Sequence, residues 1–319
     1  MHQSSAVLSS ANRLTPDEVV RQLRHLPSAP QVLPRLKKLL SDGNSSLYDV
    51  VALIRLDQGI AARVLQVGNS AYFSHGLRCY TVDEAVYRVG FDQVYELVLN
   101  AVSSQVLIRP LAVYGLAAEE LWRMSVTCAL AAEILAERMH LEQDIAYTIG
   151  LFHGIGLVAI DEWAFLRHPE LRFPAGILPL ETCESERKVL GFHNAEAGAA
   201  LLRLWDFPTV MSEPLRWQYL PRGTSMHLPL AGLLHVAKWL RTAVCSNTTE
   251  LPLPEASLLR TLNLSSSQLK KLVGAVSSRL IEVNALLDIG NPDNASAELY
   301  VEEQETASNK SMRNFIEVH

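Results

Sequence analysis

The sequence predicts an all-α protein. Apolar residues recur every three or four positions along almost the whole chain, which is the spacing of one face of a helix. No stretch alternates polar and apolar residues for long enough to indicate a strand, and many segments start at capping residues and end at glycine or proline. With 319 residues, 49% hydrophobic and 19% charged, the chain can bury a large core in about two domains.

Short helices are expected in the first third of the chain. Thr15-Pro16 opens one to about His25, and a proline-bounded break precedes another over 32–43. Ser46 caps the next helix, and Asp57 begins one that ends near Val67. The capping-box spacing of Thr81 and Glu84 then predicts a helix to Val89, followed by another over 92–108.

Longer helices are expected beyond this point, over 117–139, 144–160, 183–190, 194–205, 208–219 and 228–245. Three prolines indicate a loop over 166–182, and the polar segment 245–255 is a candidate boundary. Ser266 or Ser267 is expected to cap a last helix. Its inner stripe would be Leu269, Leu272, Val273, Val276, Leu280 and Ile281.

Charge and composition exclude several classes of protein. The net charge is −6, and residues 288–319 alone carry seven acids and two bases. A nearly balanced body argues against direct nucleic-acid binding, because such proteins need a surplus of bases. The N-terminus has no signal-peptide pattern, and the longest uncharged run, 145–160, is too short to span a membrane. Four scattered cysteines indicate buried thiols in a reducing cytoplasm.

A set of motifs in fixed order resembles the HDOD family, the regulatory bacterial relatives of the HD phosphohydrolases. The set covers roughly residues 20–245. Its pieces are LPSAPQVLPRL (26–36), SLYDVV (46–51), GIAARVLQVGNSAY (59–72), TVDEAVYRVG (81–90), LWRMS (121–125), GLFHGIG (150–156) and HNAEAG (193–198).

The resemblance implies a degenerate metal site. In the HD enzymes a histidine, a His-Asp pair and a later aspartate bind divalent metals that activate water. In this chain Met124 stands at the first position, His153 is kept, Gly154 replaces the aspartate of the pair, and Lys238 replaces the last aspartate. One imidazole binds a divalent ion weakly, so we expect no metal, no other cofactor and no catalytic residue.

Other candidate residues carry weaker expectations. His153 is expected to be a core histidine bonded to backbone or to a neighbour. Structural roles are also the simplest interpretation of His193 and Glu196, at a helix start, and of Asn69-Ser70, at a helix end, although a contact in a pocket or an interface stays open. Trp217-Gln218 stands where the family often has a pair of histidines, and the indole of Trp217 would fill the former pocket. A cavity for an anion stays open for four bases, Arg203, Arg216, Lys238 and Arg241.

The function expected from the resemblance is non-catalytic signalling in the bacterial cytoplasm, through contact with other signalling proteins in trans. Such partners include cyclic-nucleotide signalling and two-component proteins. Two alternatives stay open: a metal-dependent phosphohydrolase with altered ligands, and a nucleotide sensor that uses the vacated pocket. The expected parts are a flexible N-terminus (1–14), an N-terminal helical part (15–115), an HD-like core (116–245), a helical extension (246–290) and a disordered acidic tail (291–319).

Overall fold

The structure is a computed structural model that describes residues 14–23, 32–40, 45–74, 76–103, 110–173, 179–221, 227–246 and 251–287. In these ranges every regular element is a helix, and only one isolated bridge joins Leu111 to Leu116. The prediction of an all-α fold is therefore confirmed. The segments expected to be a flexible N-terminus and a disordered tail lie outside the described residues, except for Leu14.

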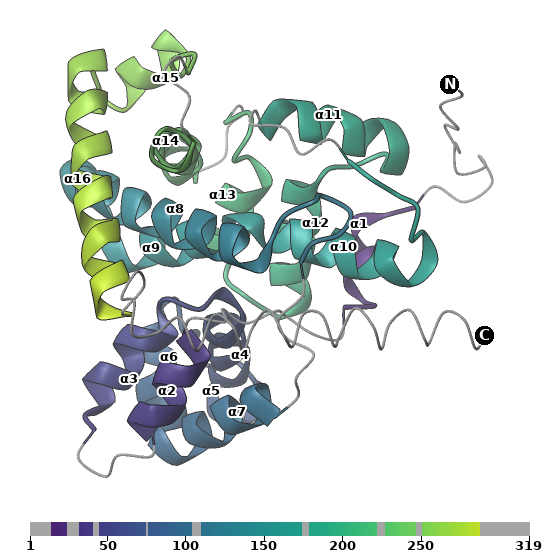
Figure 1. Cartoon of the computed structure of the whole chain (residues 1–319), viewed down its shortest axis with the longest axis vertical. Helices are drawn as coiled ribbons and strands as arrows, with labels where there is room; N and C mark the ends of the chain where they lie inside the picture. The colour runs from purple at the N-terminus through teal and green to yellow at the C-terminus, as the bar shows by residue number, and fades with distance from the viewer. Residues whose placement is uncertain are drawn as a thin grey trace.

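The first lobe is a cluster of short helices, drawn purple to blue in Figure 1. Ser46 and Thr81 cap two of its helices, as expected. The capping box is not reciprocal, because the carboxylate of Glu84 accepts from the backbone N–H of Tyr80, at 2.7 Å, and not from that of Thr81. The helices of this lobe are α2 (Val32–Leu40), α3 (Leu47–Ile54), α4 (Gln58–Gly68), α5 (Ala71–Ser74), α6 (Val82–Val89) and α7 (Phe91–Ser103).

The second lobe is built around one long helix, α8 (Ala118–Met139), which packs against α9 and α14. Its remaining elements are α9 (Gln143–Leu151), the 3-10 turn η1 (Phe152–Gly154), α10 (Ile155–Arg167), α11 (Pro179–Leu190), α12 (Asn194–Leu204), α13 (Thr209–Arg216) and α14 (Leu228–Cys245). The bounds of α8 and α14 are those expected to within one residue. Helix α11 starts earlier and α10 ends later than predicted, so both reach into the expected loop 166–182.

The first helix crosses to the second lobe. Helix α1 (Pro16–Val20) buries Val19 and Val20 against α10 and α12, well away from the first lobe in Figure 1. The segment after Pro110 also joins the second lobe, because the N–H of Val113 donates to Asp161 at 2.8 Å. The lobes therefore differ from the expected 15–115 division. The surface on which Val19 and Val20 pack is formed by residues far away in the sequence, so local sequence patterns could not place α1.

The prediction of one continuous helix over 144–160 is wrong. The chain bends at η1, because its two halves pack on different helices, α9 on α8 and α10 on α12. Both contacts are too close for a side chain. A Cβ on Gly150 would lie 2.8 Å from the Cα of Ala129, and one on Gly156 would lie 1.9 Å from the carbonyl oxygen of Asn194. The two glycines of the GLFHGIG motif thus fix the bend.

The bent segment is also apolar. By length and composition alone, Gln143–Phe165 could cross a membrane, with a mean hydropathy of 1.3. Most of this stretch, 83% of its most apolar window, is buried inside the fold. That degree of burial is typical of the core helix of a globular lobe.

Helix α16 (Ser266–Leu286) packs against α8 and α14, and the short helix α15 (Ala256–Thr261) lies beside α14, where Leu258 faces Gly232. The cap of α16 is Ser265, one residue before the positions expected. Four of the predicted inner residues are buried and Val273 is half-buried, but Ile281 is 67% exposed and does not belong to the stripe. Leu280 takes the inward position in that turn, because a helix advances 100° per residue and turns its neighbour outward.

Candidate former metal site

The bend at η1 places His153 in the core of the second lobe, with 4% of its surface exposed. Its Nδ1 lies 2.8 Å from the carbonyl oxygen of Gly150, and its Nε2 lies 2.8 Å from Nη1 of Arg241. A guanidinium can only donate, so Nε2 must accept and Nδ1 must carry the proton. Burial, followed by the charges of Arg241 and Lys238, holds the pKa of His153 well below its usual value, which keeps the ring neutral.

This arrangement is the one that a metal-binding histidine adopts. Such a ring donates one N–H to a backbone carbonyl and offers the lone pair of its other nitrogen to the cation. His153 keeps both halves of that geometry, but the guanidinium of Arg241 occupies the place of the cation. Nη2 of Arg241 is fixed by the hydroxyl of Thr242, at 3.1 Å, so the guanidinium is held from both sides.

Lys238 lies one helical turn before Arg241 and is also buried, with 4% of its surface exposed. Its Nζ is 3.2 Å from the ring centroid of Tyr219 and has no hydrogen-bond partner in the part of the chain that the structure describes. Burial is the main reason that the pKa of Lys238 lies well below its usual value, and the positive charge of Arg241 adds to it. The structure thus brings Lys238 to the same cluster as His153, as the resemblance implied.

The other two degenerate positions contribute no ligand. A Cβ on Gly154 would lie 3.5 Å from Cδ1 of Leu121, so this position faces an apolar side chain of α8. Met124 is half-buried on the same helix and takes part in none of the hydrogen bonds or ring contacts of the described residues. Among those residues, no three histidine, cysteine, aspartate or glutamate side chains gather closely enough to hold a metal ion.

Gln218 and Tyr219 complete the cluster beside the predicted Trp217. The amide of Gln218 donates to the carbonyl oxygen of His153 at 3.1 Å. The indole of Trp217 donates instead to Glu213 of its own helix, at 3.2 Å. The sequence pointed to Trp217-Gln218 and favoured the indole as the pocket filler. It did not point to Tyr219, because α13 ends at Arg216 and the direction of the following side chains depends on that end.

We use the name His153 cluster for five residues, which are His153, Gln218, Tyr219, Lys238 and Arg241. Of the four bases considered for an anion cavity, Lys238 and Arg241 are buried here, whereas Arg203 and Arg216 are exposed. The i, i+3 spacing of Lys238 and Arg241 on one helix was the available signal for their joint burial.

A buried carboxyl, Glu186 on α11, borders this cluster. It accepts from the hydroxyl of Tyr114 at 2.6 Å, from the N–H of Asn194 at 2.7 Å and from the amide of Asn194 at 2.8 Å. Burial raises the pKa of Glu186 to about 7. The same amide group of Asn194 accepts from the hydroxyl of Tyr219, at 2.9 Å, so a hydrogen-bonded chain links α11 to the cluster.

The residues predicted at helix ends do have local structural contacts. Asn69 accepts from the N–H of Cys79 at 2.7 Å and donates to its carbonyl oxygen at 3.1 Å, which clamps the chain after α5. The hydroxyl of Ser70 donates to Val67, at 2.7 Å. Glu196 caps the backbone N–H of His193, at 3.0 Å.

The expectation of buried thiols holds for three of the four cysteines, and Cys245 is half-buried. All four thiols are free, and three are buried, namely Cys79, Cys128 and Cys183. Burial raises the pKa of both Cys128 and Cys183 to about 12, which makes these thiols poor nucleophiles at neutral pH.

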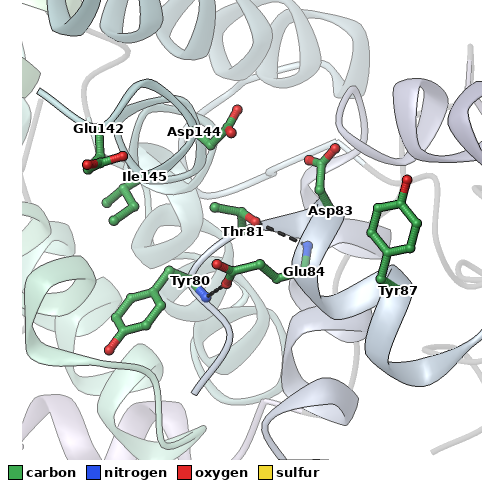
Figure 2. Close-up of a pocket in the computed structure, with 8 residues that line it drawn as sticks. All are labelled: Tyr80, Thr81, Asp83, Glu84, Tyr87, Glu142, Asp144 and Ile145. Carbon is green, nitrogen blue, oxygen red and sulfur yellow. Dashed lines mark hydrogen bonds between the residues drawn. The ribbon is translucent and has the colours of Figure 1, made fainter. Parts of the chain in front are cut away.

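A cavity of about 520 Å³ between the lobes is a competing candidate site. Figure 2 shows its acidic and aromatic lining, which α6 and the start of α9 contribute. Most of its carboxylates already serve the fold. Glu84 caps Tyr80, and Asp83 and Asp144 bind Arg55 at 3.3 and 3.1 Å. The lining is therefore the joint between the lobes and offers no set of ligands or catalytic groups.

Comparison with known proteins agrees with the fold and the motif order. An uncharacterized protein of Treponema pallidum is 24% identical over 262 residues, which are 78% of this chain and 48% of that protein. The chain thus spans about half the length of this curated relative.

Two solved structures share the fold. The MmoQ response regulator of Methylococcus capsulatus has a TM-score of 0.62 at 18% identity, over 78% of this chain and 98% of the other. A virulence factor of Campylobacter jejuni has a TM-score of 0.58 at 16% identity, over 83% and 99%. The family model of the HDOD domain matches residues 26–221, which is more than half of the sequence and includes η1 and Gln218. This protein belongs to the HDOD family.

Proposed function

We propose that this chain is a non-catalytic bacterial signalling module of the cytoplasm, which acts through contact with other signalling proteins. One observation carries the proposal, namely the hydrogen bond between Nη1 of Arg241 and Nε2 of His153. The lone pair that an HD enzyme would give to its metal is used inside the chain. A metal would have to displace a permanently charged guanidinium and then bind beside Lys238.

The family supports the regulatory half of the proposal. The chain is an HDOD protein, and one protein of similar fold is a response regulator. Shared fold at 18% identity does not transfer a partner or an activity. The expected partners therefore remain those of the sequence prediction, cyclic-nucleotide signalling and two-component proteins that bind in trans.

The catalytic alternative has a direct test. Untagged protein is assayed for phosphodiesterase and nucleotidase activity with Mg²⁺, Mn²⁺ or Fe²⁺, and its metal content is measured after dialysis. We expect no turnover and far less than one equivalent of metal. Turnover that is lost in His153→Ala and kept in Arg203→Ala, an exposed control on α12, would establish the altered-ligand phosphohydrolase instead.

The partner half of the proposal needs a separate test. The protein is used as bait in lysate of its own cells, and the proteins retained are identified by mass spectrometry. We expect signalling proteins that still bind as purified components. Retention of metabolic enzymes alone, with no signalling protein that binds after purification, would contradict the assignment.

A further inference from the structure

The His153 cluster holds two buried basic side chains without an acidic partner. Lys238 and Arg241 are 4% and 7% exposed, and neither lies within 4 Å of a carboxylate among the described residues. The carboxylate that borders them, Glu186, is already bonded to Tyr114 and Asn194. Charges buried in a folded protein are normally paired, because an isolated one costs several kcal/mol.

Two buried polar atoms beside Tyr219 also lack a hydrogen-bond partner among the described residues. They are Nζ of Lys238 and Oε1 of Gln218. Nζ lies 3.2 Å from the ring centroid of Tyr219, and Gln218 is the residue before Tyr219. Buried polar groups of native proteins are rarely left without partners, so these two atoms indicate a ligand that the cluster would bind.

We propose that the His153 cluster binds a small oxyanion of the phosphate type, held by Lys238 beside Tyr219. A ligand at this place must accept a hydrogen bond from the ammonium group of Lys238 and donate one to an acceptor such as Oε1 of Gln218. Hydrogen phosphate, or a phosphate monoester in its monoanionic form, does both through its unprotonated and protonated oxygens.

A water molecule would satisfy the hydrogen bonds but not the charge. Water can accept from Nζ and donate to Oε1, yet it gives Arg241 no counterion and does not offset the burial that lowers the pKa of Lys238. An oxyanion supplies that counterion and makes charge-assisted hydrogen bonds, which are shorter and stronger than neutral ones. The charge of the pair therefore favours the anion. This ligand site stands independently of the protein partners proposed above.

The test measures melting temperature with two probes, inorganic phosphate and adenosine monophosphate, against sodium chloride of equal ionic strength. A ligand that binds only the folded chain at tenfold its Kd is expected to raise the melting temperature of wild type by about 3–5 °C. A shift with phosphate alone indicates a free anion, and a shift with the nucleotide alone indicates a larger ligand that presents a phosphoryl group.

The variant Lys238→Met should remove the shift, whereas the matched control Arg203→Met, which deletes an exposed base, should keep it. If Lys238→Met does not fold, Lys238→Gln takes its place, and phosphorus-31 line broadening of phosphate by wild type gives a second readout. Absence of a shift and of broadening in wild type overturns the proposal, as does an undiminished shift in folded Lys238→Met. Neither result bears on the metal and turnover assays that test the proposed function.

Discussion

Two arginines of this protein stand in contrasting surroundings. Arg55, at the end of α3, binds Glu133 at 2.9 Å, Asp144 at 3.1 Å and Asp83 at 3.3 Å, and its guanidinium lies 4.4 Å from the ring centroid of Tyr147. Among the described residues Arg241 on α14 forms no ion pair with a carboxylate, and it donates to a neutral imidazole. The first arginine joins helices of both lobes, and the second lies within one lobe.

The contrast separates a structural joint from a cluster of buried bases. Around Arg55 the charges are paired with one another, and Arg279 of α16 adds a contact to Glu133 at 3.5 Å. Near Arg241, Gly154 and Lys238 stand where the resemblance to the HD enzymes places carboxylates, and neither Lys238 nor Arg241 forms an ion pair among the described residues. Departures from local satisfaction of this kind are expected at functional sites, whereas structural joints are expected to satisfy every group.

The largest expected effect concerns the carboxyl that borders the unpaired bases. The pKa of Glu186 is raised to about 7 in the fold, so the folded state holds its proton more tightly than the unfolded state does. Its contribution to stability is present below about pH 4.5 and is lost as the pH rises to about 7, a change of about 3 kcal/mol. Urea unfolding at pH values from 4.5 to 8 gives the free energy of unfolding. The effect is the difference between wild type and Glu186→Gln in how steeply this free energy falls with pH.

A matched control for this slope is Glu137→Gln, at an exposed site near the end of α8. Parallel pH profiles for wild type and Glu186→Gln would show that the hydrogen bonds of Glu186 keep it ionised throughout. In that case the region of Arg241, like the region of Arg55, would be bordered by an ionised carboxylate, and this difference between the two regions would be lost.

The second effect is the loss of the joint itself. Arg55→Met leaves three carboxylates facing one another, and we expect it to cost about 2 kcal/mol, allowing for the partial exposure of this side chain. That loss corresponds to a fall in melting temperature of about 4–8 °C. The control Arg63→Met removes an exposed arginine on α4 and should change little. Equal stability of the two variants would mean that the ion pairs of Arg55 do not stabilise the contact between the lobes.

The third and smallest effect has the opposite sign. Lys238→Met replaces an unpaired buried base by an apolar chain of similar length, and we expect it to raise the free energy of unfolding by about 1 kcal/mol in phosphate-free buffer. Chemical unfolding at pH 7 measures the change. A loss as large as that of Arg55→Met would show that Lys238 is paired in solution, and the two regions would then be alike.

Much of the fold could be predicted from the sequence because helix spacing and caps are local. The bounds of α8 and α14 and the cap at Ser46 follow from residues a few positions apart. The bend at η1 could not be predicted, because it depends on Ala129 and on the carbonyl oxygen of Asn194, which are distant in sequence. The crossing of α1 to the second lobe has the same origin.

The site could be predicted in part. The motif order pointed to His153 and Lys238, and the structure brings these two together. It did not point to the hydrogen bond between Arg241 and His153. The family pattern shows which metal ligands are missing, but it does not show which side chain bonds to His153 in place of a metal. The pair Trp217-Gln218 was named, but the inward direction of Gln218 and the presence of Tyr219 could not be predicted, since both depend on how α13 ends.

Arg241 donates a hydrogen bond to the lone pair on Nε2 of His153, and the protonation of the two ring nitrogens of His153 tests this bond most directly. Long-range proton–nitrogen NMR distinguishes the protonated nitrogen of a histidine ring from the unprotonated one. At pH 7 we expect a neutral ring with its proton on Nδ1, unchanged when equimolar Zn²⁺ is added. A proton on Nε2, or a shift of the His153 nitrogens on addition of Zn²⁺, would contradict the account.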